Sequence, residues 1–170
     1  QNRSPMHLID FESGNLTSGP LTWTQLWGTA RAPVVLYTRS GNTFTGRDGV
    51  DGGQYMFRSD LGDDAWDFGD RRMGKFVSSS FPLAAGPITF DYSGNGGYVA
   101  LCVGDGSSNC MRAYPASEAK PMQPGAFDED ALAGWIGKDV HFELVDDDPG
   151  PCWGDFRGVY NVKGMPPGGR

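Results

Sequence analysis

Short apolar runs bounded by turns are the feature of this sequence that most restricts its fold. Its 26 glycines and 12 prolines are spread along all 170 residues, which favours many turns and leaves little room for long helices. Several of the runs alternate between apolar and polar residues, as half-buried strands do. Strand–helix–strand alternation is absent, which argues against a parallel sheet. The sequence therefore predicts an all-β fold with two antiparallel sheets packed as a sandwich.

The runs give eight to ten expected strands and one short helix. The helix is expected over residues 128–135, which begin with acidic residues and are rich in Ala and Leu. The strands are expected at residues 6–11, 21–27, 34–37, 54–57, 74–81, 87–92, 97–103, 110–114, 139–145 and 156–162. This number of strands and their spacing are typical of a jelly-roll sandwich. We expect a single domain over residues 1–162 and a Gly/Pro-rich tail over residues 163–170.

The clearest alternation lies in residues 139–145. It predicts that Val140, Phe142 and Leu144 face the core. The residues between them, Asp139, His141 and Glu143, are expected to face water.

Charge and hydropathy narrow the possible partners. The formal net charge is −7 and the pI is about 4.6, so no basic surface is available for nucleic acid. No stretch is long and apolar enough for a membrane-spanning helix. The chain begins with Gln1, which we interpret as the first residue of a mature, secreted protein. Asn2 and Asn15 stand in glycosylation tripeptides, which are also typical of an extracellular protein.

Three cysteines give a mixed signal. Cys102 and Cys110 flank a strong turn, so a hairpin there would place their sulfur atoms on neighbouring strands, where they would form a disulfide or remain free. Cys152 is then left over, and it is either buried, reactive at the surface, or paired with another chain.

Catalytic motifs are absent from the sequence. Neither His7 nor His141 has the spacing of a metal-ligand or nucleophile motif, and there is no nucleophile elbow or phosphate-binding loop. We therefore predict that the protein is not an enzyme.

The acidic segment 60–72 offers two readings. Five aspartates in it can supply oxygen ligands for Ca²⁺ or can simply form a solvated loop. Trp66 lies among them and is the tryptophan least like a core residue, whereas Trp23, Trp27, Trp135 and Trp153 adjoin strands and are expected in the core. The residues expected to contact a glycan are Trp66, Tyr37, Asp64 and Arg58.

Both ends of the sequence resemble extracellular jelly-roll modules. Residues 9–16 (IDFESGNL) and 27–30 (WGTA) are similar to the opening of galactose-binding-like carbohydrate-binding modules and of sandwiches attached to levanase-type hydrolases. MAM-type adhesion domains open in a related way. Residues 53–59, 74–81 and 88–90 are similar to internal strands of these modules, and residues 137–156 to their ending. The resemblance implies a jelly roll whose first and last strands lie close together.

The resemblance also implies a structural Ca²⁺ between the two ends. Its ligands would be Glu12, which follows the first strand, Asp10 near the end of that strand, and a residue of the last strand. In the last strand this sequence has Asn161 where the family has an aspartate, so an amide oxygen would replace a carboxylate. Asp155 replaces the usual histidine of the family's closing motif, so no role of that histidine carries over.

Three functions follow as hypotheses. The first is a secreted, non-catalytic module that binds a glycan or mediates adhesion at an extracellular surface. The second is a structural subunit of an extracellular filament or matrix, a homo-oligomer or polymer assembled through its termini and Cys152. The third is a glycan hydrolase, for which a pair of carboxylates would be needed.

Overall fold

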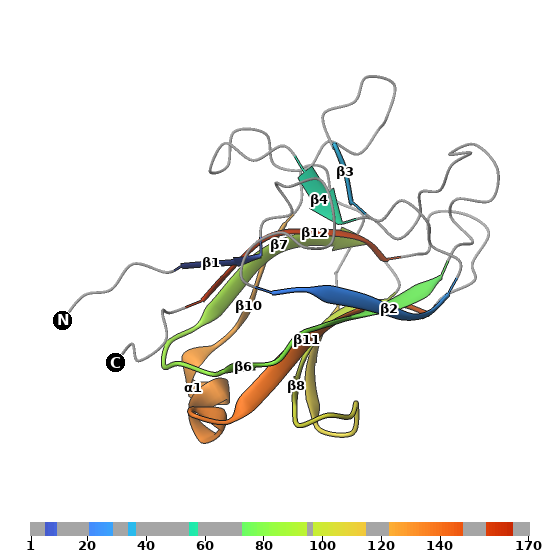
Figure 1. Cartoon of the computed structure of the whole chain (residues 1–170). Coiled ribbons are helices and arrows are strands. Elements are labelled where there is room, and N and C mark those ends of the chain that lie inside the picture. The colour runs from blue at the N-terminus through green and yellow to red at the C-terminus, as the bar shows by residue number, and fades with distance from the viewer. Residues whose placement is uncertain are drawn as a thin grey trace.

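The computed structural model describes residues 6–9, 21–28, 34–36, 55–57, 73–94, 97–114, 123–147 and 156–164. These residues form two six-stranded sheets and one short helix (Figure 1). Every strand pair in them is antiparallel. The predicted all-β, two-sheet antiparallel sandwich with one short helix is confirmed.

The first sheet has the strand order β10-β7-β12-β4-β3, and β1 pairs with β12 beside this path. The pairing of β1 with β12 confirms that the first and last strands are neighbours. The strands of this sheet are β1 (Met6–Ile9), β3 (Val34–Leu36), β4 (Tyr55–Phe57), β7 (Ile88–Gly94), β10 (Gln123–Phe127) and β12 (Phe156–Gly164).

The second sheet has the strand order β2-β5-β11-β8-β9, and β6 pairs with β11. Its centre is β11, the longest strand of this sheet. Its strands are β2 (Trp23–Gly28), β5 (Gly74–Ser78), β6 (Phe81–Pro82), β8 (Tyr98–Val103), β9 (Cys110–Ala113) and β11 (Asp139–Asp146).

The core lies between the two sheets. Val140, Phe142 and Leu144 face it from β11, as the alternation predicted, and each is at most 1% exposed. Phe142 stacks on Trp23 and on Phe81, with ring centroids 6.5 and 5.4 Å away. Burying a side chain of this size stabilises the fold by about 1.5–3 kcal/mol, so this aromatic group is a main link between β2, β6 and β11.

The helix closes one end of the sandwich. It comprises α1 (Glu129–Leu132) and a 3₁₀ turn, η2 (Ala133–Trp135), close to the predicted 128–135. Leu132 is buried in the core, and Trp135 packs against it from a partly exposed position. Backbone hydrogen bonds between Leu83 and the segment after η2, from Leu83 N–H to Lys138 O and from Gly137 N–H to Leu83 O, fix this end.

Several element boundaries differ from those predicted. Strand β10 was not expected, because Pro124 and Gly125 disfavour a strand. The strand nevertheless forms by pairing with β7, and it lies at the edge of the sheet, where Pro and Gly are tolerated. The strand expected at 74–81 is divided into β5 and β6. Strand β12 continues to Gly164, so the last two residues of the strand lie beyond the expected domain boundary.

The prediction that Trp27 is a core residue is wrong. Its side chain is 43% exposed, whereas Trp23 on the same strand is 7% exposed. A register shift between Gln25 and Trp27 interrupts the pairing of β2 with β5, and beyond it Trp27 lies opposite Lys75. A shift of one residue turns a side chain to the other face of a sheet, so Trp27 leaves the core face. Trp153 lies outside the described residues.

Within the described part of the chain, no helix has the length and hydrophobicity needed to cross a membrane.

Candidate functional site

The outer face of the second sheet, turned away from the core, carries an unusual set of buried polar groups. On β11, His141 and Glu143 alternate with the core residues and so point to this face. His141 lies opposite Cys102 of β8, and Glu143 lies between Val77 of β5 and Ala100 of β8. The prediction that His141 and Glu143 face water is wrong, because they are only 3% and 2% exposed.

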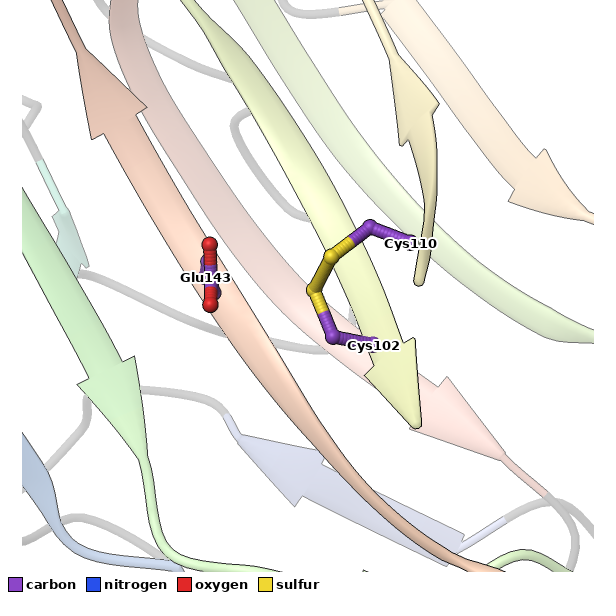
Figure 2. A group of neighbouring side chains, drawn as sticks. All are labelled: Cys102, Cys110 and Glu143. Carbon is purple, nitrogen blue, oxygen red and sulfur yellow. A yellow bond between two sulfur atoms is a disulfide. The ribbon is translucent and has the colours of Figure 1, made fainter. Parts of the chain in front are cut away.

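The hairpin loop between β8 and β9, residues 104–109, supplies one of the contacts to these side chains. Its base is closed by a disulfide between Cys102 and Cys110, which are opposite partners in the ladder. The disulfide predicted from the turn between these cysteines is therefore present, with an S–S distance of 2.00 Å. Figure 2 shows that Glu143 of β11 lies beside this bridge. The loop itself is exposed.

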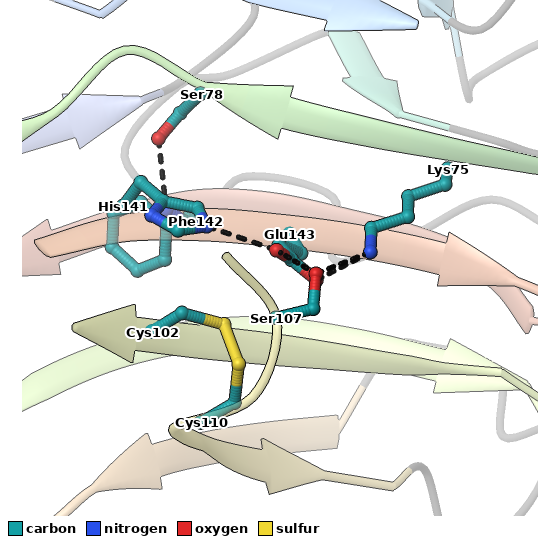
Figure 3. Close-up of a disulfide and its surroundings, with 8 residues drawn as sticks. All are labelled: Lys75, Ser78, Cys102, Ser107, Cys110, His141, Phe142 and Glu143. Carbon is teal, nitrogen blue, oxygen red and sulfur yellow. Dashed lines mark hydrogen bonds and ion pairs between the residues drawn. A yellow bond between two sulfur atoms is a disulfide. The ribbon is translucent and has the colours of Figure 1, made fainter. Parts of the chain in front are cut away.

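Glu143 is the centre of a polar cluster that also contains Lys75, Ser107 and His141 (Figure 3). Ser107 Oγ donates to Glu143 Oε2 at 2.8 Å, and His141 Nε2 lies 2.9 Å from the same oxygen. Lys75 Nζ lies 3.2 Å from Glu143 Oε1 and donates a hydrogen bond to Ser107 Oγ. Residues from β5, β11 and the hairpin loop thus meet at one carboxylate.

The cluster keeps Glu143 ionised. Burial would raise the pKa of Glu143, but hydrogen bonds from His141, Ser107 and Lys75, together with the charge of Lys75, hold that pKa below its ordinary value. A buried carboxylate is costly unless it is paired and hydrogen-bonded, and here both conditions are met. The cluster therefore fixes the loop to the sheet.

The arrangement does not match a catalytic triad. In a triad the imidazole lies between the hydroxyl and the carboxylate, so that it can remove the hydroxyl proton. Here the Glu143 carboxylate lies between Ser107 and His141. The hydroxyl of Ser107 therefore donates its proton to a carboxylate and not to an imidazole.

The same region does not form a metal site in this oxidation state. The two cysteine sulfurs and a Glu143 oxygen lie within 4.8 Å of one another. However, the sulfurs are bonded to each other, and metal ligation needs thiolates.

An exposed aromatic platform lies on the same hairpin. It consists of Tyr98 on β8, Arg112 on β9 and Tyr114 just after β9. The two tyrosine rings lie 5.4 Å apart, and the Arg112 guanidinium carbon lies 4.7 Å from the centre of the Tyr98 ring. Tyr98 is 9% exposed and Tyr114 is 58% exposed, so Tyr98 supports the platform and Tyr114 presents a ring to solvent.

The platform is held in place from several sides. A hydrogen bond with the Tyr114 side chain, with a further contribution from Tyr98, raises the pKa of Arg112 above its ordinary value. Tyr92 of the first sheet donates from its hydroxyl to the Tyr114 carbonyl at 3.2 Å. Burial raises the pKa of Tyr98, so its phenol stays neutral. An exposed ring with a fixed position and a neighbouring hydrogen-bond donor is suited to binding a polar ring-shaped ligand.

Most of the site residues predicted from the sequence lie outside the described residues. This holds for the expected glycan contacts Trp66, Tyr37, Asp64 and Arg58, and for Asp10, Glu12, Asn2, Asn15 and Cys152. Asn161 lies within β12, and its neighbour Val162 pairs with Ile9 at the end of β1. This pairing brings the last described residue before Asp10 next to the strand that carries Asn161.

Sequence reasoning missed both the platform and the polar cluster. For the platform a signal was present, because Arg112 and Tyr114 are two residues apart in a run that follows a turn, and such residues share one face. For the cluster no comparable signal exists. Lys75, Ser107 and Glu143 are 32 and 36 residues apart in sequence, and only the strand order brings them together.

No protein-family model matches the sequence, and no protein of curated function matches it. Solved structures do match. A family 61 carbohydrate-binding module, solved in complex with β-1,4-galactotriose, has a TM-score of 0.50 and 14% identity, over 95% of this chain and 99% of that one. A family 29 carbohydrate-binding module has a TM-score of 0.46 and 13% identity, over 96% and 89%.

The enzymatically active domain of bacteriophage CBA120 tailspike protein 4 has a TM-score of 0.52 and 12% identity. That match covers 94% of this chain but 21% of the tailspike chain. At these identities the likeness shows a shared β-sandwich fold, the fold that carbohydrate-binding modules use.

Proposed function

We propose that this protein is a non-catalytic module that binds glycans at the face formed by the β8–β9 hairpin. The observation that carries the proposal is the exposed Tyr114 ring, which is fixed beside Arg112 on a disulfide-closed hairpin. Sugar rings stack their C–H faces on aromatic rings, and their hydroxyl groups take hydrogen bonds from nearby polar side chains.

The ionisable groups of the hairpin support binding rather than catalysis. His141 and Glu143 are buried and bonded to each other, so they are in no position to reach a substrate. The exposed polar residues of the loop, Asp105, Ser108 and Asn109, can instead bond to sugar hydroxyls. Because the disulfide and the Ser107–Glu143 bond hold the loop in place, less conformational entropy is lost on binding.

The match over nearly the whole length of a carbohydrate-binding module is consistent with this function. We further propose that the protein acts outside the cell, as its acidic charge, its glycosylation tripeptides and its disulfide suggest. A structural Ca²⁺ held by Asp10, Glu12 and Asn161 also remains a proposal. So do the contacts of Trp66, Tyr37, Asp64 and Arg58, which Trp66→Ala would test in the same assay.

The experiment is a binding measurement with Tyr114→Ala. Affinity electrophoresis against a polysaccharide panel, followed by calorimetry with β-1,4-galactotriose, gives binding constants for the wild-type protein and the variant. Loss of one stacked aromatic ring weakens binding by about 1–2 kcal/mol, or about five- to thirtyfold. Ile136→Ala is the matched control, because Ile136 is 44% exposed and follows the 3₁₀ turn η2, outside the β8–β9 hairpin. If Tyr114→Ala and Ile136→Ala bind as the wild-type protein does, the platform is not the site.

A further inference from the structure

Arg112 differs from Lys75, the other positively charged residue that the described part of the chain places on the outer face of the second sheet. Lys75 is engaged by Glu143 and Ser107, as Figure 3 shows, so its charge is already neutralised. Arg112 is exposed, and among the described residues no carboxylate forms an ion pair with it. Its direct contacts are with the Tyr98 ring and the Tyr114 side chain, and the Glu143 carboxylate attracts it from farther along the same face.

The way in which Arg112 is held leaves its hydrogen-bonding edge available. The guanidinium carbon lies 4.7 Å from the centre of the Tyr98 ring, so the ring contacts the group without using its N–H donors as a carboxylate would. One of its hydrogen bonds goes to the Tyr114 side chain. A guanidinium has five N–H donors in a planar fork, and two of them together match the two oxygens of a carboxylate.

The net charge of the whole chain bears on which ligands Arg112 can bind. With a net charge of −7 the protein repels anions in general, so an anionic ligand needs a local positive group in order to bind. Arg112 provides that group beside the exposed Tyr114 ring, on the same face.

We propose that the glycan bound at this hairpin is acidic, and that Arg112 holds a sugar carboxylate, as in a uronic acid, by a bidentate hydrogen bond while Tyr114 stacks on a sugar ring. This inference rests on the proposed glycan-binding function and specifies its ligand class. Arg112 is then the residue that determines specificity, because a neutral sugar leaves its charge without a partner.

The test compares one oligosaccharide in two forms. Oligogalacturonate carries free carboxylates, whereas its methyl ester has the same sugar chain without the charge. Calorimetry should show that wild-type protein binds the free acid at least about tenfold more tightly than the ester, since hydrogen bonds between charged groups are about twice as strong as those between neutral groups. Arg112→Gln should bind both forms with the same low affinity. Arg112→Lys should recover only part of the preference, because an ammonium group lacks the planar fork.

The control variant is Lys138→Gln, which lowers the net charge by the same amount. Lys138 is exposed and lies between the helix and β11, away from the platform. It should change the affinity for the free acid by less than about twofold, because exposed charges at a distance are screened. A sulfated galactan oligosaccharide tests whether the site requires a carboxylate or attracts any anion. If the wild-type protein binds this oligosaccharide as tightly as the free acid, and Arg112→Gln weakens both equally, the assignment to a carboxylate is overturned.

Two further results distinguish failure of the acidic-ligand inference from failure of the proposed glycan-binding function. If the wild-type protein binds the ester and β-1,4-galactotriose as tightly as the free acid, and Arg112→Gln changes nothing, the acidic ligand is wrong while glycan binding stands. If none of these oligosaccharides nor any polysaccharide of the panel binds, the proposed function fails and the inference fails with it.

Discussion

Glu143 keeps its charge at 2% exposure because three side chains bond to it: His141 from the same strand, and Lys75 and Ser107 from distant parts of the sequence. Each of these side chains has a different role: Lys75 supplies charge, Ser107 ties down the loop, and His141 fills the space beside the disulfide with a polar ring. The alternation of residues 139–145 predicted correctly that Glu143 points away from the core. Its burial was not predictable, because the contact from Ser107 comes from a position 36 residues away.

The charge of Glu143 leads to a prediction for Glu143→Gln. The folded-state pKa is lowered, so the stability that Glu143 contributes is fully present above its unfolded pKa of about 4.3 and is lost as the pH falls through the lower folded pKa. We expect the variant to be about 2–3 kcal/mol less stable than the wild-type protein at pH 7. At pH 3 the difference should be clearly smaller. Urea unfolding at the two pH values measures both.

Glu129→Gln is the control for that experiment. Glu129 is exposed in the first turn of α1, so its neutralisation should change the free energy of unfolding by less than about 1 kcal/mol. If Glu143→Gln and the wild-type protein lose stability in parallel between pH 7 and pH 3, the polar cluster is not a source of the acid sensitivity.

Among the elements, the β8–β9 hairpin was the most predictable because its determinants are local. A turn with two glycines between two short apolar runs indicates the hairpin, whereas the sequence left open whether the two cysteines that flank it form the disulfide that the structure shows. The β2–β5 pair was less predictable. The alternation of β2 gives the correct face for Trp23, but the register shift after Gln25 reverses it for Trp27, and nothing in the residues of β2 alone indicates this shift.

The register of β2 and β5 predicts the effect of Gly28→Ala. Gly28 lies opposite Gly74, with φ of +120°, and a Cβ placed on it would be 2.2 Å from the Met73 carbonyl oxygen and 2.3 Å from the Gly74 Cα. Backbone atoms cannot move aside without separating the two strands. We expect a loss of more than about 3 kcal/mol, measured by chemical denaturation.

Gly134→Ala is the matched substitution for comparison. Gly134 lies in the 3₁₀ turn η2, and nothing lies within 4 Å of the position where its Cβ would be. The alanine variant should be as stable as the wild-type protein or more stable by about 0.5–1 kcal/mol. Equal stability of the two alanine variants would contradict the close approach of β2 to β5.

At the scale of the whole molecule, the first strand, β1, and the last strand, β12, pair in the first sheet. The resemblance of both ends to one family of modules predicted this, and the pairing of Ile9 with Val162 confirms it. A resemblance to a family relates segments that are far apart in the sequence, because both segments match the same fold. A local pattern of residues describes only the segment in which it occurs. The resemblance did not extend to the aromatic platform, since Arg112 and Tyr114 lie outside the segments that carry the resemblance.

Because β1 and β12 pair, the proposed Ca²⁺ site can be tested through the free energy of unfolding of the whole domain. If Asp10, Glu12 and Asn161 bind Ca²⁺ in the folded state only, free Ca²⁺ at about 100 times its dissociation constant adds about 2.7 kcal/mol to the free energy of unfolding. For a chain of this size that raises the Tm by about 5–10 °C. Glu12→Gln should lose most of the increase, whereas Glu129→Gln should retain it. Differential scanning calorimetry in Ca²⁺, in Mg²⁺ and in chelator provides the measurement, and the same Tm in all three solutions would exclude a structural Ca²⁺.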